Sequence, residues 1–460
     1  MLRSLFLLVS LFVCTVATHG QLIRKKEANA IDELLANLSS QHKPGNYLIK
    51  DVNVLTMVDS IILEGQDVLV SEGVIQAIGK RLNPSISHEV IDGSQQYLMP
   101  GLTDMHVHLF HNHPLKNTWG LLMLLNGITS VRDMAGEPEK LLLRDQISRN
   151  EVLFPTIYQA GPLVNGKDNQ FGVLATTPGE GRKLVREHKK MGYDFIKVYD
   201  DLNLDTYQAI ADEAIKEEIQ VVGHIPFDVP LQEALKYQSS IEHLTGYKDW
   251  RDRVEAYQSV EDDYPQQTTY SEAWNCPTYY NLMMNWGGME EAKKILTDLN
   301  PFIPNRLLAK WESMLNQNVE AKQRMVTQFG VANRQVFTKI VLGLYESKAK
   351  LIAGTDAGSL PLMVPGFALH KELALLHEAG IPVYDVLKMT TINAALAIEK
   401  ETAFGTLEVG KRADLLLLES NPLVSLENLQ KRSGLMMRGI WLSKNELERI
   451  EQEIKGVFGK

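Results

Sequence analysis

The sequence predicts an α/β fold: a (β/α)8 barrel of the TIM type, with a small β-sandwich-like domain formed by both chain ends. Three observations predict it. Apolar, β-rich runs alternate with helical stretches through the middle of the 460-residue chain, which is typical of βα units around a parallel sheet. Short β-rich runs also occur near both ends of the chain. Polar residues close several central runs, as they do at the carboxyl ends of barrel strands.

The chain begins with a segment typical of a signal peptide, which we assign to residues 1–20. A basic start at Arg3 is followed by an uncharged run from Ser4 to Thr18, and this run is short for a membrane span. The mature protein is therefore expected to be exported, to the periplasm or outside the cell, with no stable membrane insertion. Cys14 leaves lipidation open, although no small residue precedes it. Once the leader is removed, Cys276 is the only cysteine and no intrachain disulfide can form.

The domain organisation follows from where the β-rich runs lie. Residues 21–96 are predicted to form the first part of the small β-domain, and residues 401–460 return to it. Residues 97–400 are predicted to form the barrel, with helical and aromatic cap insertions at about 247–330. Eight strands are expected, and they end near His106, Asp133, Gly161, Tyr199, His224, His243, Thr278 and Asp356.

The segment from Leu204 to Glu218 shows the pattern of an outer barrel helix. Its apolar residues recur at helical spacing on one stripe, which contains Tyr207, Ile210, Ala211, Ala214 and Ile215.

Composition excludes several classes of protein. Hydrophobic residues make up 44% of the chain and charged residues 23%, which is ordinary for a globular protein. The formal net charge of -10 opposes binding to nucleic acid, because phosphates select clustered Lys and Arg. The sequence does not determine an oligomeric state.

A His-x-His pair is the strongest local signal for chemistry. His106 and His108 stand in the run Met99-Pro100-Gly101-Leu102-Thr103-Asp104-Met105-His106-Val107-His108. Side chains two residues apart on a strand share a face, so both imidazoles can point at one cation. Alone, such a pair is weak evidence.

Four more polar residues strengthen this signal, because each ends an apolar, strand-like run: Lys197, His224, His243 and Asp356. A charged group in that position is unfavourable unless it is paired or bound to a metal. Catalytic residues of barrel enzymes lie at strand carboxyl ends, so we expect all six side chains to converge on one site.

These motifs resemble the amidohydrolase superfamily, in its binuclear-metal branch with prolidase-like and imidazolonepropionase-related exported members. The resemblance rests on Pro-Gly-Leu-x-Asp-x-His-x-His, Glu-His, Gly-Thr-Asp-Ala-Gly and the closing Gly-x-x-Glu-x-Gly-Lys-x-Ala-Asp from Gly405 to Asp414. It implies two divalent metal ions, with zinc as the expected metal, although the ligand types also suit manganese, cobalt, nickel or iron. It implies one ligand set of His106, His108 and Asp356, and a second of His224 and His243.

The resemblance also assigns roles to two of these residues. Lys197 would be carboxylated by carbon dioxide and bridge both metals as a carbamate, and burial beside cations supplies the neutral amine that this needs. Asp356 would be the general base beside a metal-bridging hydroxide. Arg132 and Tyr247 are weaker candidates for substrate binding, with a structural ion pair and lid packing as equal alternatives.

The function predicted is hydrolysis of an amide or peptide bond in a small substrate, a dipeptide or an N-acyl amino acid. Lys197, and the absence of an acid after His224, favour this two-metal chemistry over one-metal deamination. Two alternatives stay open: hydrolysis of a cyclic amide or lactone at the same site, and a non-catalytic binding protein on the same scaffold.

Overall fold

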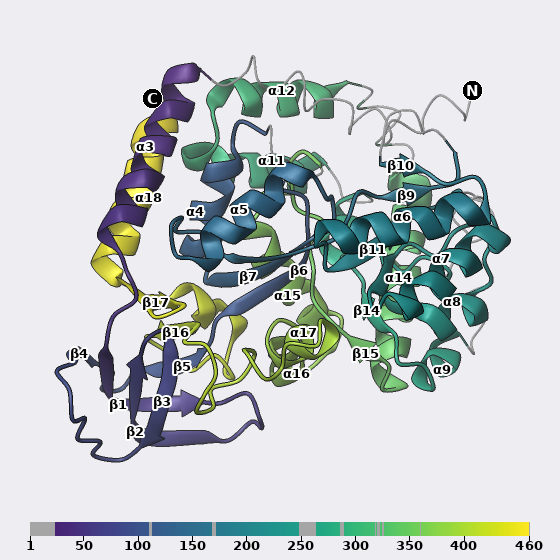
Figure 1. Ribbon diagram of the computed structural model, residues 1–460. Coiled ribbons are helices and arrows are strands. Elements are labelled where there is room, and N and C mark those ends of the chain that lie inside the picture. Colours follow the sequence, from purple (N-terminus) through teal and green to yellow (C-terminus); the bar gives the residue numbers. More distant parts are fainter. Residues whose placement is uncertain are drawn as a thin grey trace.

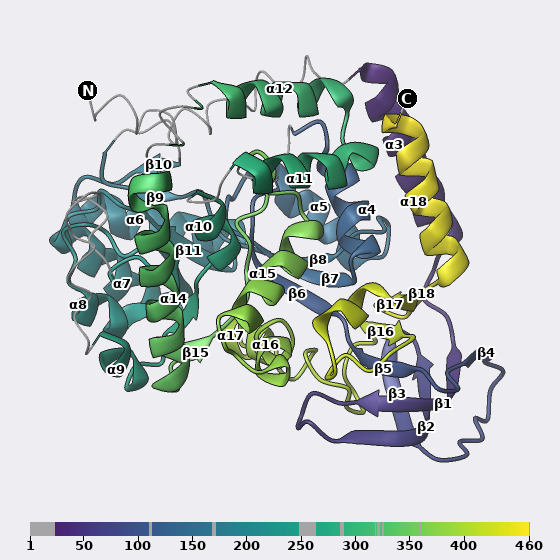
Figure 2. The same ribbon diagram turned by 180° about the vertical axis from the view of Figure 1, so that it is seen from behind.

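The computed structural model describes most of the chain, and Figures 1 and 2 show it from opposite sides. The described residues are 24–109, 113–167, 172–247, 264–285, 289–317, 319, 323, 326–358 and 360–459. The predicted signal peptide at residues 1–20 lies outside them. Among the described helices, none combines the length and the hydropathy needed to cross a membrane.

Two sheets of parallel strands form the central part of the molecule. One has the order β6-β7-β8 and the other the order β10-β9-β11-β12-β13-β14-β15. Isolated parallel bridges connect them, from Ala160 to Phe195 and from Val107 to Ala357. The α/β class with parallel strands is thus confirmed. The strands are β6 (Leu102–Val107), β7 (Ile128–Asp133), β8 (Thr156–Gln159), β9 (Val164–Asn165), β10 (Val173–Leu174), β11 (Phe195–Val198), β12 (Gln220–Gly223), β13 (Gln238–Glu242), β14 (Trp274–Cys276) and β15 (Lys350–Leu351).

Helices separate most of these strands and lie outside them (Figure 1). In α7 (Leu204–Lys216), the side chain of Asn203 accepts a hydrogen bond from the Thr206 N–H and begins the helix. Tyr207 and Ile210 are fully buried as predicted, but Ile215 is 64% exposed. The other helices of this region are α4 (Lys116–Leu125), α5 (Pro138–Ser148), α6 (Pro178–Met191), α8 (Leu231–Tyr237), α14 (Val331–Glu346), α15 (Phe367–Glu378), α16 (Val383–Met389) and α17 (Ile392–Ala397).

The two chain ends meet in one eight-stranded sheet, at the bottom of Figure 1. Its order is β18-β17-β16-β5-β1-β2-β3, with β4 paired to β1. The described residues form one continuous sheet here rather than two separate ones. It contains β5, so the small unit extends four residues past the predicted boundary at 96/97. The strands are β1 (Tyr47–Leu55), β2 (Ile62–Ser71), β3 (Val74–Gly79), β4 (Glu89–Asp92), β5 (Tyr97–Pro100), β16 (Leu415–Leu418), β17 (Arg432–Met437) and β18 (Ile440–Ser443).

Two helices that the sequence analysis did not predict flank this sheet. They are α3 (Lys25–Gln41) and α18 (Lys444–Phe458), which lie side by side in both views. Each buries one apolar stripe, which explains why they pack together. Ser443 and Glu446 form a capping box that begins α18. The chain ends therefore contribute helices as well as strands.

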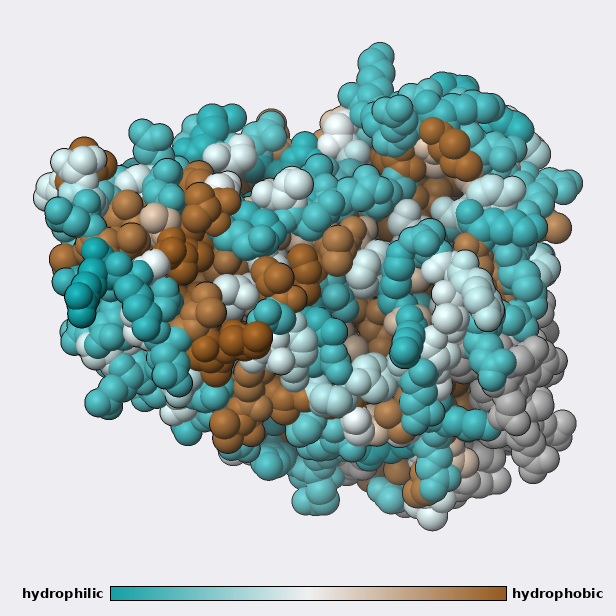
Figure 3. Space-filling view, turned by 90° about the horizontal axis from the view of Figure 1, so that it is seen from below, coloured by the Kyte–Doolittle hydropathy of each residue, from teal (hydrophilic) through white to brown (hydrophobic). Residues whose placement is uncertain are grey.

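Hydrophobic side chains are exposed on the face seen in Figure 3. Figure 3 shows the molecule from below, where hydrophobic surface gathers on the side that holds the eight-stranded sheet. Val58 and Ile61, in the turn between β1 and β2, are 60% and 61% exposed.

The segment predicted to be a helical and aromatic cap is described only in part, because residues 248–263, 286–288, 318, 320–322 and 324–325 lie outside the described residues. Its described portion is largely helical and also contains β14. The helices are α9 (Tyr264–Thr269), α10 (Tyr279–Asn285), α11 (Met289–Leu299) and α12 (Asn305–Asn316).

Candidate metal centre

His106 lies at the centre of a polar cluster at the carboxyl ends of the parallel strands. It stands on β6 with no exposed surface. Its Nδ1 lies 2.7 Å from Oε2 of Glu242, and a carboxylate accepts but does not donate, so the Nδ1 proton points at Glu242. The Nε2 atom is left to face the cluster, where it lies 3.3 Å from Nε2 of His108 and 3.5 Å from Oδ1 of Asp356.

A buried ion pair lies beneath His106. The other oxygen of Glu242 accepts hydrogen bonds from Nη2 of Arg132, at 2.7 Å, and from Oγ of Ser240, at 2.6 Å. Arg132 also donates to the backbone oxygen of Met105 and to Ser240. Neither Arg132 nor Glu242 is exposed. The network fixes the ring of His106, as partners behind metal-ligating histidines do.

Asp356 faces both histidines of the His-x-His pair. Its Oδ1 lies 2.9 Å from Nε2 of His108, and its Oδ2 accepts a hydrogen bond from Nδ2 of Asn281 at 2.5 Å. Asn281 is on α10, which places a side-chain amide behind the carboxylate. Both oxygens of Asp356 are therefore held in fixed directions.

Lys197 comes from β11 and is 1% exposed. Its Nζ lies 3.4 Å from Nε2 of His106. Burial lowers the pKa of Lys197, and the carboxylates of Asp356 and Glu242 oppose the shift. The side chain therefore has more neutral amine at neutral pH than an exposed lysine has.

His224 and His243 complete the cluster from the ends of β12 and β13. Nδ1 of His224 lies 2.7 Å from Oδ1 of Asp200. Nδ1 of His243 lies 2.7 Å from Oγ1 of Thr278, whose hydroxyl donates to the backbone oxygen of Pro277, so His243 is the donor. The rings of His243 and His106 are 4.6 Å apart, and those of His243 and His224 are 4.9 Å apart.

The backbone turns sharply where it presents these ligands. His243, Thr278 and Asp356 have φ angles of 59°, 45° and 63°. This left-handed region is unfavourable for residues other than glycine, and it occurs often at functional sites. Gly354 is required for a different reason: a Cβ atom there would lie 2.7 Å from the backbone nitrogen of His106. The glycine lets the chain before Asp356 approach β6.

Burial favours the neutral imidazole of three of these histidines. It lowers the pKa of His106 and of His243 well below the ordinary value, and it also lowers that of His108. Burial alone would raise the pKa of Asp356, but the hydrogen bond from His108 and the electrostatic influence of His243, His108 and Lys197 outweigh it, and the pKa falls. Neutral imidazoles beside an ionised carboxylate are the protonation states that bind metal.

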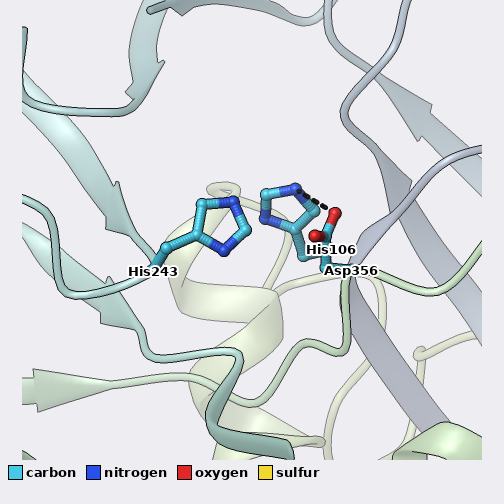
Figure 4. Close-up of side chains that lie close together, drawn as sticks. All are labelled: His106, His243 and Asp356. Carbon is cyan, nitrogen blue, oxygen red and sulfur yellow. Dashed lines mark ion pairs between the residues drawn. The ribbon is translucent and has the colours of Figure 1, made fainter. Parts of the chain in front are cut away.

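The donor set fits divalent metal ions. Ligand atoms of His106, His243 and Asp356 lie within 4.8 Å of one another, and Figure 4 shows these side chains together, with the ion pair between His106 and Asp356 marked. Histidine nitrogens and a carboxylate oxygen are ligands that zinc and related metals accept. Hydrogen bonds that fix Nδ1 of three histidines direct each Nε2 inward.

The structure thus brings together the six side chains that the sequence predicted to converge, but not the two weaker candidates. Arg132 is engaged beneath the cluster with Glu242. Tyr247 is fully buried, and its hydroxyl contacts Thr268 and Asn275. Burial and these polar partners favour the structural alternatives over substrate contact for both residues.

Several partners of the ligands were missed by sequence reasoning. They are Glu242, Asp200, Thr278, Asn281 and Asp104, which accepts from the hydroxyl of Thr355 and the backbone N–H of His106. Tyr199, whose ring lies 4.2 Å from that of His224, was also missed. A local signal existed for Glu242 and Tyr199, which share strand ends with His243 and Lys197. No local signal connects Asn281 with Asp356.

Comparison with known proteins places the chain in a family. The profile of the amidohydrolase family matches residues 97–441. A 5-methylthioadenosine/S-adenosylhomocysteine deaminase from Caldanaerobacter subterraneus subsp. tengcongensis is 23% identical over 428 residues, covering 82% of this chain and 85% of the relative. A bottromycin amidohydrolase structure is similar with a TM-score of 0.77 at 23% identity, covering 93% of each chain. A protein from Bifidobacterium longum assigned as a prolidase gives 0.66 at 22% identity, covering 89% of this chain and 99% of that one.

At these identities the solved structures support only the fold. The family match covers most of the chain and therefore also shows the family. Members of this family generally use divalent metal ions and act on small molecules, which agrees with the donor set described above. The chain therefore belongs to the amidohydrolase family and is an enzyme that acts on carbon–nitrogen bonds.

Proposed function

We propose that this enzyme is a metal-dependent hydrolase that cleaves an amide or peptide bond in a small substrate, a dipeptide or an N-acyl amino acid. One observation carries the proposal: Lys197, buried and 3.4 Å from His106, lies within the histidine and aspartate cluster. Two divalent ions would need more negative charge than Asp356 alone brings, and a carbamate formed on Lys197 would supply it. The fold that the chain shares with a protein assigned as a prolidase supports the proposal.

We further propose that the site lies at one end of a closed barrel. The strands β6, β7, β8, β11, β12, β13, β14 and β15 would form a (β/α)8 barrel, with the bridges at Ala160 and Val107 joining its two sheets. One ion would be held by His106, His108 and Asp356. The other would be held by His224 and His243. When bound, such ions lower the pKa of a coordinated water and polarise a carbonyl group.

Lys197 would complete the site as a carbamate. Its neutral amine adds to carbon dioxide, forming a nitrogen–carbon bond and releasing one proton, so a neutral group becomes an anion. Zinc is the metal proposed. The lowered pKa of Lys197 favours the reacting amine. With Asp356, the carbamate brings two negative charges to offset the four positive charges of two divalent ions.

Residues of the protein would take the proton from the attacking water and deliver it to the leaving group. Asp356 is the proposed general base, and it would pass the proton to the leaving amine. Asn281 holds Oδ2 of Asp356, which leaves Oδ1 to accept. Burial raises the pKa of Tyr199, so its hydroxyl stays protonated beside His224 as a donor for a substrate oxygen.

Two other activities are alternatives to peptide hydrolysis. A deaminase is among the relatives, and a cyclic amide or lactone could use the same residues. The residues after His224 favour hydrolysis. Ile225 and Pro226 stand there, where deaminase-like members of the superfamily carry an acid. We also propose that residues 1–20 direct export, to the periplasm or outside the cell.

The test is turnover by purified protein that has been reconstituted with zinc or manganese in bicarbonate buffer. The panel contains dipeptides, N-acyl amino acids, a lactam, a lactone and an adenosine derivative. We expect hydrolysis of a linear amide, two metals per chain and a 44 Da increase in the mass of the peptide that contains Lys197 in a native digest. Release of ammonia from the adenosine derivative, or turnover of the lactone alone, would overturn the proposal. Fewer than one metal per chain would instead support a binding protein.

A further inference from the structure

A carboxylate outside the ligand set is buried close to the site. Glu372 stands on α15 with no exposed surface. Its Oε1 accepts the backbone N–H of Tyr279 at 2.9 Å, and its Oε2 accepts that of Tyr280 at 2.5 Å. Among the residues that the structure describes, no cation pairs with it. Burying a carboxylate in this way is unfavourable unless hydrogen bonds compensate, so its two N–H partners account for its position.

These two N–H groups belong to the first turn of α10 (Tyr279–Asn285). The first N–H groups of a helix have no partner within the helix. Glu372 therefore supplies, from a distant part of the chain, the acceptors that α10 lacks. Both oxygens are used, and this fixes the rotation of α10 as well as the position of its end.

The same end of α10 holds two ligands of the metal centre. Thr278, immediately before the helix, accepts the hydrogen bond from Nδ1 of His243 at 2.7 Å. Asn281, in its first turn, donates to Oδ2 of Asp356 at 2.5 Å. His243 and Asp356 are two of the three residues in Figure 4. They come from different parts of the chain, and the residues at the start of α10 contact both of them, through Thr278 and Asn281.

We propose that Glu372 is a positioning residue of the metal centre that acts through α10. It holds Thr278 against His243, and it holds Asn281 against Asp356. The inference rests on the proposed metal-dependent hydrolysis and adds a residue that lies outside the ligand set. The hydrogen bonds of Glu372 go to the start of α10 and not to any of the six proposed ligands.

The experiment compares Glu372→Gln with Glu378→Gln, an exposed position on the same helix. Glutamine keeps the shape of the side chain, but only one of its two terminal groups accepts a hydrogen bond, so one N–H of α10 loses its partner. We expect Glu372→Gln to weaken zinc binding about 10- to 100-fold, the range for partners that orient metal ligands. The turnover number should fall with little change in KM. Glu378→Gln should match the wild type in both.

A double-mutant cycle separates positioning from general structural support. Asn281→Ala alone removes the donor to Asp356. If Glu372 acts through α10, the double variant should lose less zinc affinity than the two single losses combined. Full additivity, or a folded Glu372→Gln protein with wild-type zinc affinity and turnover, would overturn the inference. If Glu372→Gln does not fold, Glu372→Asp keeps both oxygens but withdraws them by one methylene, and the same measurements apply.

The controls keep this inference distinct from the proposed function. Wild-type protein that binds no zinc and hydrolyses no amide refutes the proposed function. Wild-type protein that does both, beside an unaffected Glu372→Gln variant, refutes only the role of Glu372.

Discussion

Two fully buried carboxylates lie in different surroundings near the metal centre. Glu242, beneath His106, contacts a guanidinium, a hydroxyl and an imidazole. Glu372, behind α10, contacts two backbone N–H groups and, within the described chain, no cation. Burial raises the pKa of Glu372 to about 8, against the hydrogen bonds from Tyr280 and Tyr279, which lower it. Equal burial thus has different consequences, and the partners decide them.

A buried carboxylate can be stabilised by a cation or by hydrogen bonds alone, and the two residues differ in this respect. Glu242 faces Arg132, so the pair carries no net charge, and its hydrogen bonds are all directed by neighbouring strands. Such a pair is a poor source of stability, but losing one partner leaves a charge unpaired. Among the described residues Glu372 has no partner of opposite charge, so only its two N–H donors stabilise the charged form, and burial shifts its pKa upward against them. Three variants test this contrast.

Glu242→Gln should have the largest effect. The change leaves Arg132 buried without its counter-ion and removes the carboxylate from Nδ1 of His106. We expect a loss of about 3 kcal/mol or more in the free energy of unfolding and a loss of zinc binding. Chemical denaturation and metal titration measure the two effects.

A second substitution checks the cause of that loss. Arg132→Met combined with Glu242→Gln removes both charges, so the double variant should be more stable than the sum of the single losses predicts. If the single Glu242→Gln variant were as stable as wild type, the buried charge pair could not be the feature that distinguishes this carboxylate from Glu372.

The ligands of the site could be predicted from the sequence, but the partners of these two carboxylates could not. The positions of His106 and Lys197 were predictable because each ends an apolar run, and strand ends of a parallel fold share one edge. The hydrogen bond from His106 to Glu242 spans 136 residues, and that from Tyr279 to Glu372 spans 93. Such pairings depend on which strands and helices become neighbours, and no local pattern encodes this.

Other differences have local causes. Ile215 fits the apolar stripe of α7 by spacing, yet in the last turn of the helix its side chain is exposed. The helix α18 carried a readable signal in Ser443 and Glu446, which have capping-box spacing.

The next largest effect is expected in the pH dependence of the free energy of unfolding, to which the ionisation of Glu372 contributes. Burial raises its pKa to about 8 in the folded protein, against an ordinary value of 4.5. Below about pH 4.5 the side chain is protonated in both states. Between these values the unfolded chain releases the proton and the folded protein keeps it, so the free energy of unfolding falls as pH rises, by at most about 1.4 kcal/mol per pH unit. The fall should end above about pH 8.

The measurement is the difference between wild type and Glu372→Gln in urea denaturation from pH 5 to pH 8, since groups that titrate equally in both cancel. Asp104, Cys276 and Tyr279 feel the charge of Glu372. Among them Asp104, whose pKa burial raises to about 7, titrates in this range, so Asp104→Asn in both backgrounds is the control. A constant difference across the range would show that Glu372 is ionised throughout, like a carboxylate with a cation.

Asp200→Asn should give the smallest change in stability, because it tests a third carboxylate that stays in contact with water. Asp200 accepts from Nδ1 of His224, as Glu242 does from His106, but its side chain is 24% exposed. Water can replace a lost contact there, so we expect less than about 1 kcal/mol of destabilisation. Zinc affinity should still fall about 10-fold, because the amide is a weaker acceptor and orients the ring less firmly. Isothermal titration with zinc and thermal unfolding of the metal-free protein separate these effects. A loss of stability as large as that of Glu242→Gln would mean that the His-carboxylate contact itself, rather than the dryness of its surroundings, sets the energetic difference between the regions.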